Sequence, residues 1–281
     1  MSLKFDLENV DTELPIDGGV AAFDPVSLRL AAQALSDRGG TVHLLPNVAG
    51  TQSPTLTRLA EVVVAPAQGI PTSVVATVDT RRLRWDRGTF TPKAVDFTDY
   101  TGATKYGVDL GHLAVADMGD TRVTFVDMLT ENDEPLTVWF AELPAELTSA
   151  DARALTDLAL RTRDSWEEAE RYTALVTIPA QQLTYVASPQ VSHVDDWDLT
   201  GVLQKFAAAF DETGARVIAQ TAMFASASLT PPPERTFGER GPVVLWFTER
   251  GAEVPFSIIY TSSLAWLKAG TKVDIDGLQL P

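Results

Sequence analysis

The sequence predicts an α+β protein made of two diverged tandem repeats, each a mostly antiparallel sheet with one or two helices. Three observations carry this prediction. Short aliphatic segments are separated by tight turns, helical segments open at good capping residues, and the two halves of the chain share matched residues. The length of 281 residues suits two domains of ordinary size. We expect the two units to pack about a pseudo-twofold axis.

The matched residues run in the same order through both halves. Segment 58–68 aligns with segment 171–181, and both end in Pro-Ala-Gln. Segment 135–142 aligns with 242–249, and each contains a Trp-Phe pair. Four of the six tryptophans fall into matched pairs, namely Trp85 with Trp197 and Trp139 with Trp246. Collinear matches that include rare residues indicate an internal duplication.

The duplication predicts the domain limits. We expect an N-terminal arm at 1–20, repeat unit 1 at 21–147, and repeat unit 2 at 148–270. Residues 271–281 alternate apolar and polar side chains, which predicts a C-terminal tail or edge strand.

A helix is expected near the start of each unit. Asp24-Pro25 places a capping residue before a proline in the first helical position, and Gly39-Gly40 ends the apolar periodicity that follows. In the second unit, residues 148–151 resemble a capping box, and apolar residues continue at helical spacing from Leu155. The alanine-rich segment 202–210 predicts a further helix in the second unit.

Strands are predicted wherever β-branched and aliphatic residues cluster between turn signals. In the first unit the expected strands are 61–65, 73–78, 113–116, 122–128 and 136–141. In the second unit they are 174–178, 183–187, 216–227, 243–248 and 256–261. Tight connections such as Met118-Gly119-Asp120 favour hairpins and therefore antiparallel pairing.

Composition excludes several classes of function. The net charge of −16 disfavours nucleic acid and anionic membranes as partners. The absence of cysteine excludes disulfides, thiolate metal sites and cysteine nucleophiles. The chain opens without a signal-peptide pattern and has no apolar run long enough to span a membrane, so we expect a cytoplasmic protein. High Ala, Val, Asp and Arg with little Lys is typical of a GC-rich genome, so we expect a bacterial source.

No motif predicts catalysis. The three histidines, His43, His112 and His193, lack a zinc spacing, and phosphate-binding glycine loops are missing. A divalent cation could use the carboxylates beside His193, but acidic loops are usually only solvated. The matched Glu142 and Glu249 could serve acid-base chemistry. We predict no catalytic residue, no metal ligand and no cofactor.

A charge contrast at matched positions predicts the interaction surface. Four arginines surround the Trp-Asp pair in the first unit, whereas the second unit has three aspartates there, Asp195, Asp196 and the shared Asp198 of the pair itself. The contrast can mean that two exposed loops acquired different charges without functional consequence. It can also mean that the two loops are electrostatically complementary, within one chain or between chains. Arginine and tryptophan are enriched where protein interfaces carry most of their binding energy. The candidate residues are Arg81, Arg82, Arg84, Trp85, Arg87, Asp195, Asp196, Trp197 and Asp198.

These observations favour a non-catalytic binding or assembly protein with a cleft or paired surfaces between its duplicated halves. The expected partner is another protein or a second copy of the chain. The alternative is a hydrolase or other small-molecule enzyme that uses carboxylates at the interface between the repeats. A shared deep pocket would favour the enzyme, whereas an exposed Trp85 or Trp197 would favour binding.

Overall fold

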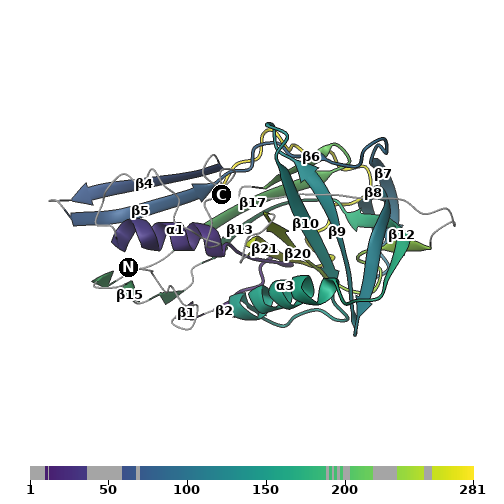
Figure 1. The fold of residues 1–281 in the computed structure, drawn as a ribbon, viewed down its shortest axis with the longest axis horizontal. Coiled ribbons are helices and arrows are strands. Elements are labelled where there is room, and N and C mark those ends of the chain that lie inside the picture. The colour runs from purple at the N-terminus through teal and green to yellow at the C-terminus, as the bar shows by residue number, and fades with distance from the viewer. Residues whose placement is uncertain are drawn as a thin grey trace.

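The computed structural model describes residues 10–11, 13–36, 59–67, 70–187, 190–191, 193–194, 197–198, 203–217, 233–249 and 255–281. The molecule is elongated: a compact part holds most strands, and a narrower part carries one helix and a long hairpin (Figure 1). The compact part is built around a single ten-stranded sheet.

The large sheet has the strand order β19-β12-β8-β9-β10-β20-β21-β3, with β6 and β7 attached to β9 and β8. The pairings among its described strands are antiparallel except that of β12 with β19. The strands are β3 (Val20–Phe23), β6 (Arg84–Trp85), β7 (Lys93–Thr98), β8 (Thr104–Met118), β9 (Thr121–Leu129), β10 (Pro135–Glu142), β12 (Arg171–Pro179), β19 (Glu234–Thr236), β20 (Val243–Thr248) and β21 (Phe256–Thr261).

A three-stranded sheet and four two-stranded pairs complete the described strands. The three-stranded sheet, called the small sheet below, has the order β13-β17-β18, from β13 (Gln181–Ala187), β17 (Gln204–Asp211) and β18 (Gly214–Val217). The pairs are β1 (Val10–Asp11) with β14 (Gln190–Val191), β2 (Glu13–Leu14) with β11 (Ala150–Asp151), β4 (Ala60–Ala67) with β5 (Ile70–Val78), and β15 (His193–Val194) with β16 (Trp197–Asp198).

Two helices flank the strands in the described residues. Helix α1 (Pro25–Ser36) packs against β4 and β5 in the narrow part, and α3 (Ala152–Trp166) lies against the compact part (Figure 1). The cap predicted at Asp24 is confirmed, because its Oδ1 accepts the N–H groups of Val26 and Ser27 at 2.8 and 2.9 Å. The helix at 152–166 is also as predicted, but its N-cap is Asp151, which accepts from Ala154 N at 2.7 Å.

Both faces of the large sheet are covered. On one face, Trp139 stacks on its cross-strand partner Trp246 at 6.0 Å and meets Trp166 of α3 edge-on at 5.3 Å. On the other face, Phe247 packs on Phe210 of the small sheet at 5.9 Å. The alternation of large rings along β10 and β20 therefore packs two layers at once, as the Trp-Phe pairs predict.

The predicted tandem duplication is wrong. Strands from both halves alternate within one large sheet, where β10 and β20 are direct neighbours. Segments aligned in sequence also lie in different settings. β4 and β5 pair only with each other among the described strands, whereas β12 joins the large sheet and β13 joins the small one. No cleft separates two halves, because a continuous hydrogen-bonded sheet passes through the middle of the molecule.

Local turn chemistry explains part of the sequence match. Asp99 accepts hydrogen bonds from the backbone N–H and hydroxyl of Thr101 at 2.8 and 2.7 Å. Asp211 accepts the same pair from Thr213 at 2.7 and 2.6 Å. A glycine with positive φ follows in each case. Similar residues therefore recur because two hairpins use the same aspartate turn.

The helix predicted at 202–210 is also wrong, since this segment forms β17. Its apolar residues do not alternate with polar ones because both faces of the strand are covered. Phe206, Ala208 and Phe210 belong to the main core, whereas Ala207 and Ala209 pack under the C-terminal residues. A strand buried on both faces lacks the period-two pattern that distinguishes it from a helix.

Candidate groove beside β13

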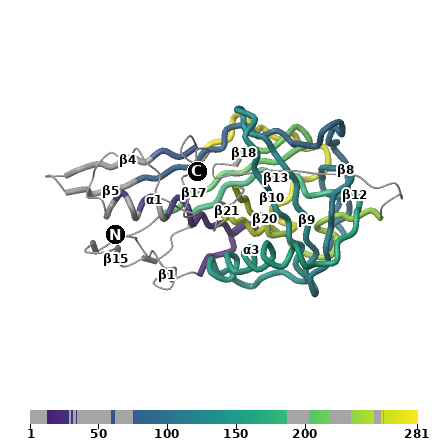
Figure 2. The backbone as a smooth tube through the Cα atoms, viewed as in Figure 1, coloured from purple at the N-terminus to yellow at the C-terminus, as the bar shows by residue number. Residues whose placement is uncertain are grey.

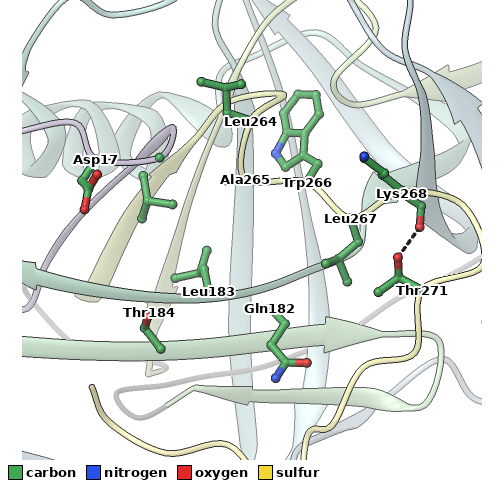
Figure 3. Close-up of a pocket in the computed structure, with 12 residues that line it drawn as sticks. Asp17, Gln182, Leu183, Thr184, Leu264, Ala265, Trp266, Leu267, Lys268 and Thr271 are labelled. Atoms are coloured by element: carbon green, nitrogen blue, oxygen red, sulfur yellow. Dashed lines mark hydrogen bonds between the residues drawn. The ribbon is translucent and has the colours of Figure 1, made fainter.

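An open groove of about 470 Å³ lies beside β13. Three segments line it: the turn at 17–20, residues 182–184 of β13, and the loop at 264–271. In Figure 3 the loop forms one wall and β13 the facing wall, with Asp17 at one end and Lys268 with Thr271 at the other.

The turn at 17–20 is fixed by its backbone. Asp17 and Val20 exchange two backbone hydrogen bonds of 2.9 and 2.8 Å, and Gly18 and Gly19 both have positive φ. Gly19 is also required by space, because a Cβ there would stand 2.5 Å from Ser262 Oγ. Ser262 N donates to Gly19 O at 2.9 Å, so the turn and the loop hold each other in place.

The loop wall rests on a buried polar network. Ser263 Oγ donates to Asp99 Oδ2 at 2.5 Å, and Lys105 Nζ donates to Ser263 O at 2.5 Å. Burial raises the pKa of the Asp99 carboxyl, but hydrogen bonds from Ser263, Thr101 and Ala103 outweigh it, so its pKa lies below the ordinary value. The carboxylate therefore stays charged and fixes the loop. With four donors it is saturated, which is a positioning role rather than a catalytic one.

The tryptophan of the loop points into the protein and anchors the wall. Trp266 is buried, donates from Nε1 to Thr261 Oγ1 at 3.0 Å, and meets Tyr100 edge-on at 5.7 Å. Leu264 points the other way, and its side chain is 80% exposed. The loop therefore presents one large apolar side chain to solvent beside the groove.

β13 supplies the other wall and has an open edge. Within the described strands it is the terminal strand of the small sheet, and only an isolated bridge between Gln181 and Trp266 touches its free side. Leu267 N donates to Ala180 O on that side at 3.2 Å. Because backbone groups alternate in direction along a strand, the N–H and C=O of Thr184 also face away from β17, into the groove.

The sequence-predicted residues lie in two separate places. Arg81, Arg82, Arg84, Trp85 and Arg87 share the segment that links β5 to β7, with β6 on the compact part, whereas β15 and β16 lie in the narrow part near α1 (Figure 1). Trp197 and Asp198 form β16, and Asp195 and Asp196 fall outside the described residues. The complementarity predicted between these two segments stays a prediction.

All five residues in the arginine segment have partners inside the chain. Arg81 N donates to Asp79 Oδ1 at 2.9 Å, and Arg81 Nε lies 3.9 Å from Asp79 Oδ2. Arg82 pairs with Asp276 at 2.6 Å, and Arg84 pairs with Asp133. Arg87 donates to Leu110 O and His112 O, and burial lowers its pKa despite nearby aspartates. Trp85 is half-buried and donates from Nε1 to Asp211 O at 2.8 Å. Arg81 is exposed and has a φ of 56°, in the left-handed region.

The matched carboxylates of the predicted enzyme alternative, Glu142 and Glu249, lie at opposite ends of the paired strands β10 and β20. Glu142 is buried, accepts from Gly238 N and Arg240 N at 2.8 and 2.9 Å, and lies 3.1 Å from Arg122 Nη1. Burial raises its pKa, while those backbone bonds and Arg122 lower it. It secures the turn after β19. Among the described residues no three carboxylates or histidines form a metal-binding group. An active site between duplicated halves is therefore excluded together with the halves.

Sequence reasoning missed the groove. The pair Asp17-Gly18 is a hairpin signal that could have placed the turn. Nothing in Ser262-Ser263-Leu264 identifies the loop, because its conformation depends on Asp99 and Lys105, far away in the chain.

Comparison with known proteins does not identify this chain. No family model matches, and neither does any curated protein. Solved structures of serpins align with part of this chain. Native tengpin, a thermophilic serpin, aligns over 68% of this chain at a TM-score of 0.40 and 14% identity. Thyroxine-binding globulin with thyroxine aligns over 86% at 0.43 and 10%, and maspin over 67% at 0.41 and 11%. The chain spans 54%, 65% and 56% of these three structures. Similarity at this level assigns neither family nor activity.

No helix in the described residues has the length and apolar character needed to cross a membrane.

Proposed function

We propose that this protein binds an extended segment of a partner protein in the groove beside β13. One observation carries the proposal: among the described strands none pairs with the edge of β13 at Thr184, which lies inside a groove whose opposite wall bears the exposed Leu264. Backbone hydrogen bonds to a strand edge give affinity for any extended chain, and side-chain pockets give selectivity.

The walls suit an extended peptide better than a compact ligand. The groove is open rather than enclosed, and its two ends carry opposite charges, Asp17 and Lys268, both exposed. Leu264 and Leu183 offer apolar contact between those ends. A segment with an apolar residue at its centre, a basic residue toward Asp17 and an acidic residue toward Lys268 matches this order.

The walls are also preorganised. A hydrogen bond between Gly19 and Ser262 joins the turn to the loop, and one between Leu267 and Ala180 joins the loop to the residue before β13. The bond from Ser263 to Asp99 fixes the loop itself. A groove that is already rigid loses little entropy when a peptide binds, which favours useful affinity from a short contact. We place this interaction in the cytoplasm, since a chain without cysteine fits a reducing compartment.

A peptide selection tests the proposal. Random eight-residue peptides displayed on phage are selected on the full chain, and the affinities of the enriched peptides are measured by fluorescence polarisation. Leu264→Asp removes the exposed apolar side chain from the loop wall. Thr184→Pro removes the backbone N–H at the open edge of β13, where proline is tolerated. Val75→Asp, at a 56% exposed valine of β5, is the matched control.

We expect each groove variant to weaken binding at least tenfold and the control to leave it unchanged. Peptides that bind Leu264→Asp and Thr184→Pro as tightly as the parent protein would refute the proposal. An empty selection would refute it as well.

A further inference from the structure

The C-terminal tail, residues 271–281, lies across the outer face of the small sheet. Its buried side chains Ile275 and Leu278 pack on Ala207 and Ala209 of β17, here called the alanine face. In the described part of the chain these residues form a hydrophobic cluster separate from the main core. Figure 2 marks the C-terminus beside β17.

Polar contacts from three basic residues surround the alanine face. Arg82 Nη1 lies 2.6 Å from Asp276 Oδ2, and Arg216 Nη1 donates to Asp276 O at 2.9 Å. Lys205 Nζ donates to Pro281 O at 2.6 Å. Arg216 is also paired with Asp79 at 2.9 Å. In a chain with a net charge of −16, Arg82 and Lys205 supply the remaining positive charge beside this face. They favour an acidic segment at this place.

The tail is held by side chains rather than by a strand ladder. No element is assigned within residues 271–281. Its backbone is anchored to the small sheet by Asp274 N, which donates to the Gln182 side chain at 3.0 Å. The Arg82–Asp276 pair is exposed, with side-chain exposures of 38% and 68%, and such pairs contribute little to stability. Ordering eleven residues carries an entropic cost, and the tail's apolar contact comes from Ile275, Leu278 and the partly buried Val273, so we expect the contact to be exchangeable.

We propose that the alanine face is a docking surface for an acidic segment of a partner protein, and that the tail occupies it as an internal substitute. The partner segment carries two aliphatic residues spaced as Ile275 and Leu278 are, with an acidic residue between them placed like Asp276. This surface is distinct from the groove and lies beyond the function proposed above.

The test uses the full chain and a synthetic peptide with the sequence of residues 271–281. The released variant Ile275→Asp/Leu278→Asp keeps every residue of the sheet but removes the apolar contacts of its own tail. Leu280→Asp, at a 38% exposed position of the same tail, is the matched control. Near-ultraviolet circular dichroism establishes that each variant keeps its native packing, and fluorescence polarisation measures peptide binding.

We expect the peptide to bind the released variant at least tenfold more tightly than the parent protein or the control, because a tethered tail competes at high effective concentration. A peptide with Asp274→Lys and Asp276→Lys should bind at least tenfold more weakly, and added salt should weaken the native peptide. Arg82→Glu in the released variant should weaken binding at least threefold.

Three results would overturn the proposal. The first is no binding to a natively packed released variant, and the second is equal binding of a scrambled peptide. The third is that the parent protein is a dimer and the released variant is a monomer. The alanine face would then be occupied by the tail of a second copy.

Discussion

The two faces of β17 are covered in different ways. On the inner face Phe206 and Phe210 are fully buried in the main core, where Phe210 meets Phe247. On the outer face Ala207 and Ala209 are just as buried, and among the described residues the tail is what forms a hydrophobic cluster with them. The two faces are therefore equally buried but differ in what buries them. Large side chains of the inner face pack in the main core, whereas the small side chains of the outer face are covered by a separate segment that can detach.

We therefore expect the inner face of β17 to contribute most to the stability of the fold, and the tail on the outer face to be replaceable by another segment. The ion pairs follow the same division. Glu142 and Arg122 are buried within the large sheet, while Arg82 and Asp276 meet at the surface.

The largest expected effect is on the inner face. Phe210→Ala should lower the free energy of unfolding by about 3–5 kcal/mol, because it removes a fully buried ring and leaves a cavity. Urea unfolding followed by tryptophan fluorescence measures the loss. A loss below about 1 kcal/mol would remove the distinction between the two faces.

The buried ion pair should give the next effect. Glu142→Ala leaves Arg122 buried with only Asp117 at 3.6 Å, and should cost about 3 kcal/mol. Glu142→Gln retains an acceptor for Gly238 N and Arg240 N, so its cost should be smaller, about 1–2 kcal/mol. At the surface, Arg82→Ala should change stability by less than about 0.5 kcal/mol. Similar losses for Glu142→Ala and Arg82→Ala would contradict the account.

The junction of α1 with the small sheet should respond to pH. Burial raises the pKa of Asp24 from 3.8 to about 6, against hydrogen bonds from Ser27, Val26 and Ser257. The folded state therefore binds this proton more tightly than the unfolded state does. Unfolding free energy should fall as pH rises from about 4 to about 6, and the full penalty persists above 6.

Asp24→Asn keeps an acceptor for the helix cap but cannot ionise. Relative to the parent protein it should gain stability as the pH rises through this window, by up to about 3 kcal/mol. Urea unfolding of both proteins between pH 4 and pH 8 measures the difference. Parallel stability curves would show that Asp24 does not titrate as described.

The smallest effect is expected in the tail. Ile275→Ala and Leu278→Ala should each lower the free energy of global unfolding by less than about 1 kcal/mol, although both side chains are buried. If the tail detaches before the rest of the protein unfolds, a substitution in it can lower the free energy of global unfolding by no more than the free energy of that detachment. A loss of 2 kcal/mol or more would make the tail part of the cooperative core.

Individual elements were more predictable than their arrangement. The Asp24-Pro25 cap and the Trp-Phe strands follow from local chemistry, and the structure has them where expected. The apparent duplication arose from the same local chemistry, since Asp99 and Asp211 build the same turn in different sheets. Which strands become neighbours depends on contacts between distant segments, and no local pattern records them.

The groove shows the same limit. Its loop is shaped by Asp99 and Lys105, which precede it by more than 150 residues. The alanine run in β17 looked helical because a covering tail removes the polar positions that mark a strand. Residues whose burial depends on a distant segment are therefore the ones that sequence reasoning assigns wrongly.

Amide hydrogen exchange along β13 tests the central claim most directly. Leu183 and Tyr185 face β17 and should exchange slowly, whereas Thr184, whose N–H faces the groove, should exchange at least a hundredfold faster in the free protein. Addition of a selected peptide should then protect Thr184 alone among the three. If Thr184 in the free protein is as protected as its two neighbours, the edge is already covered and the groove cannot bind an extended segment.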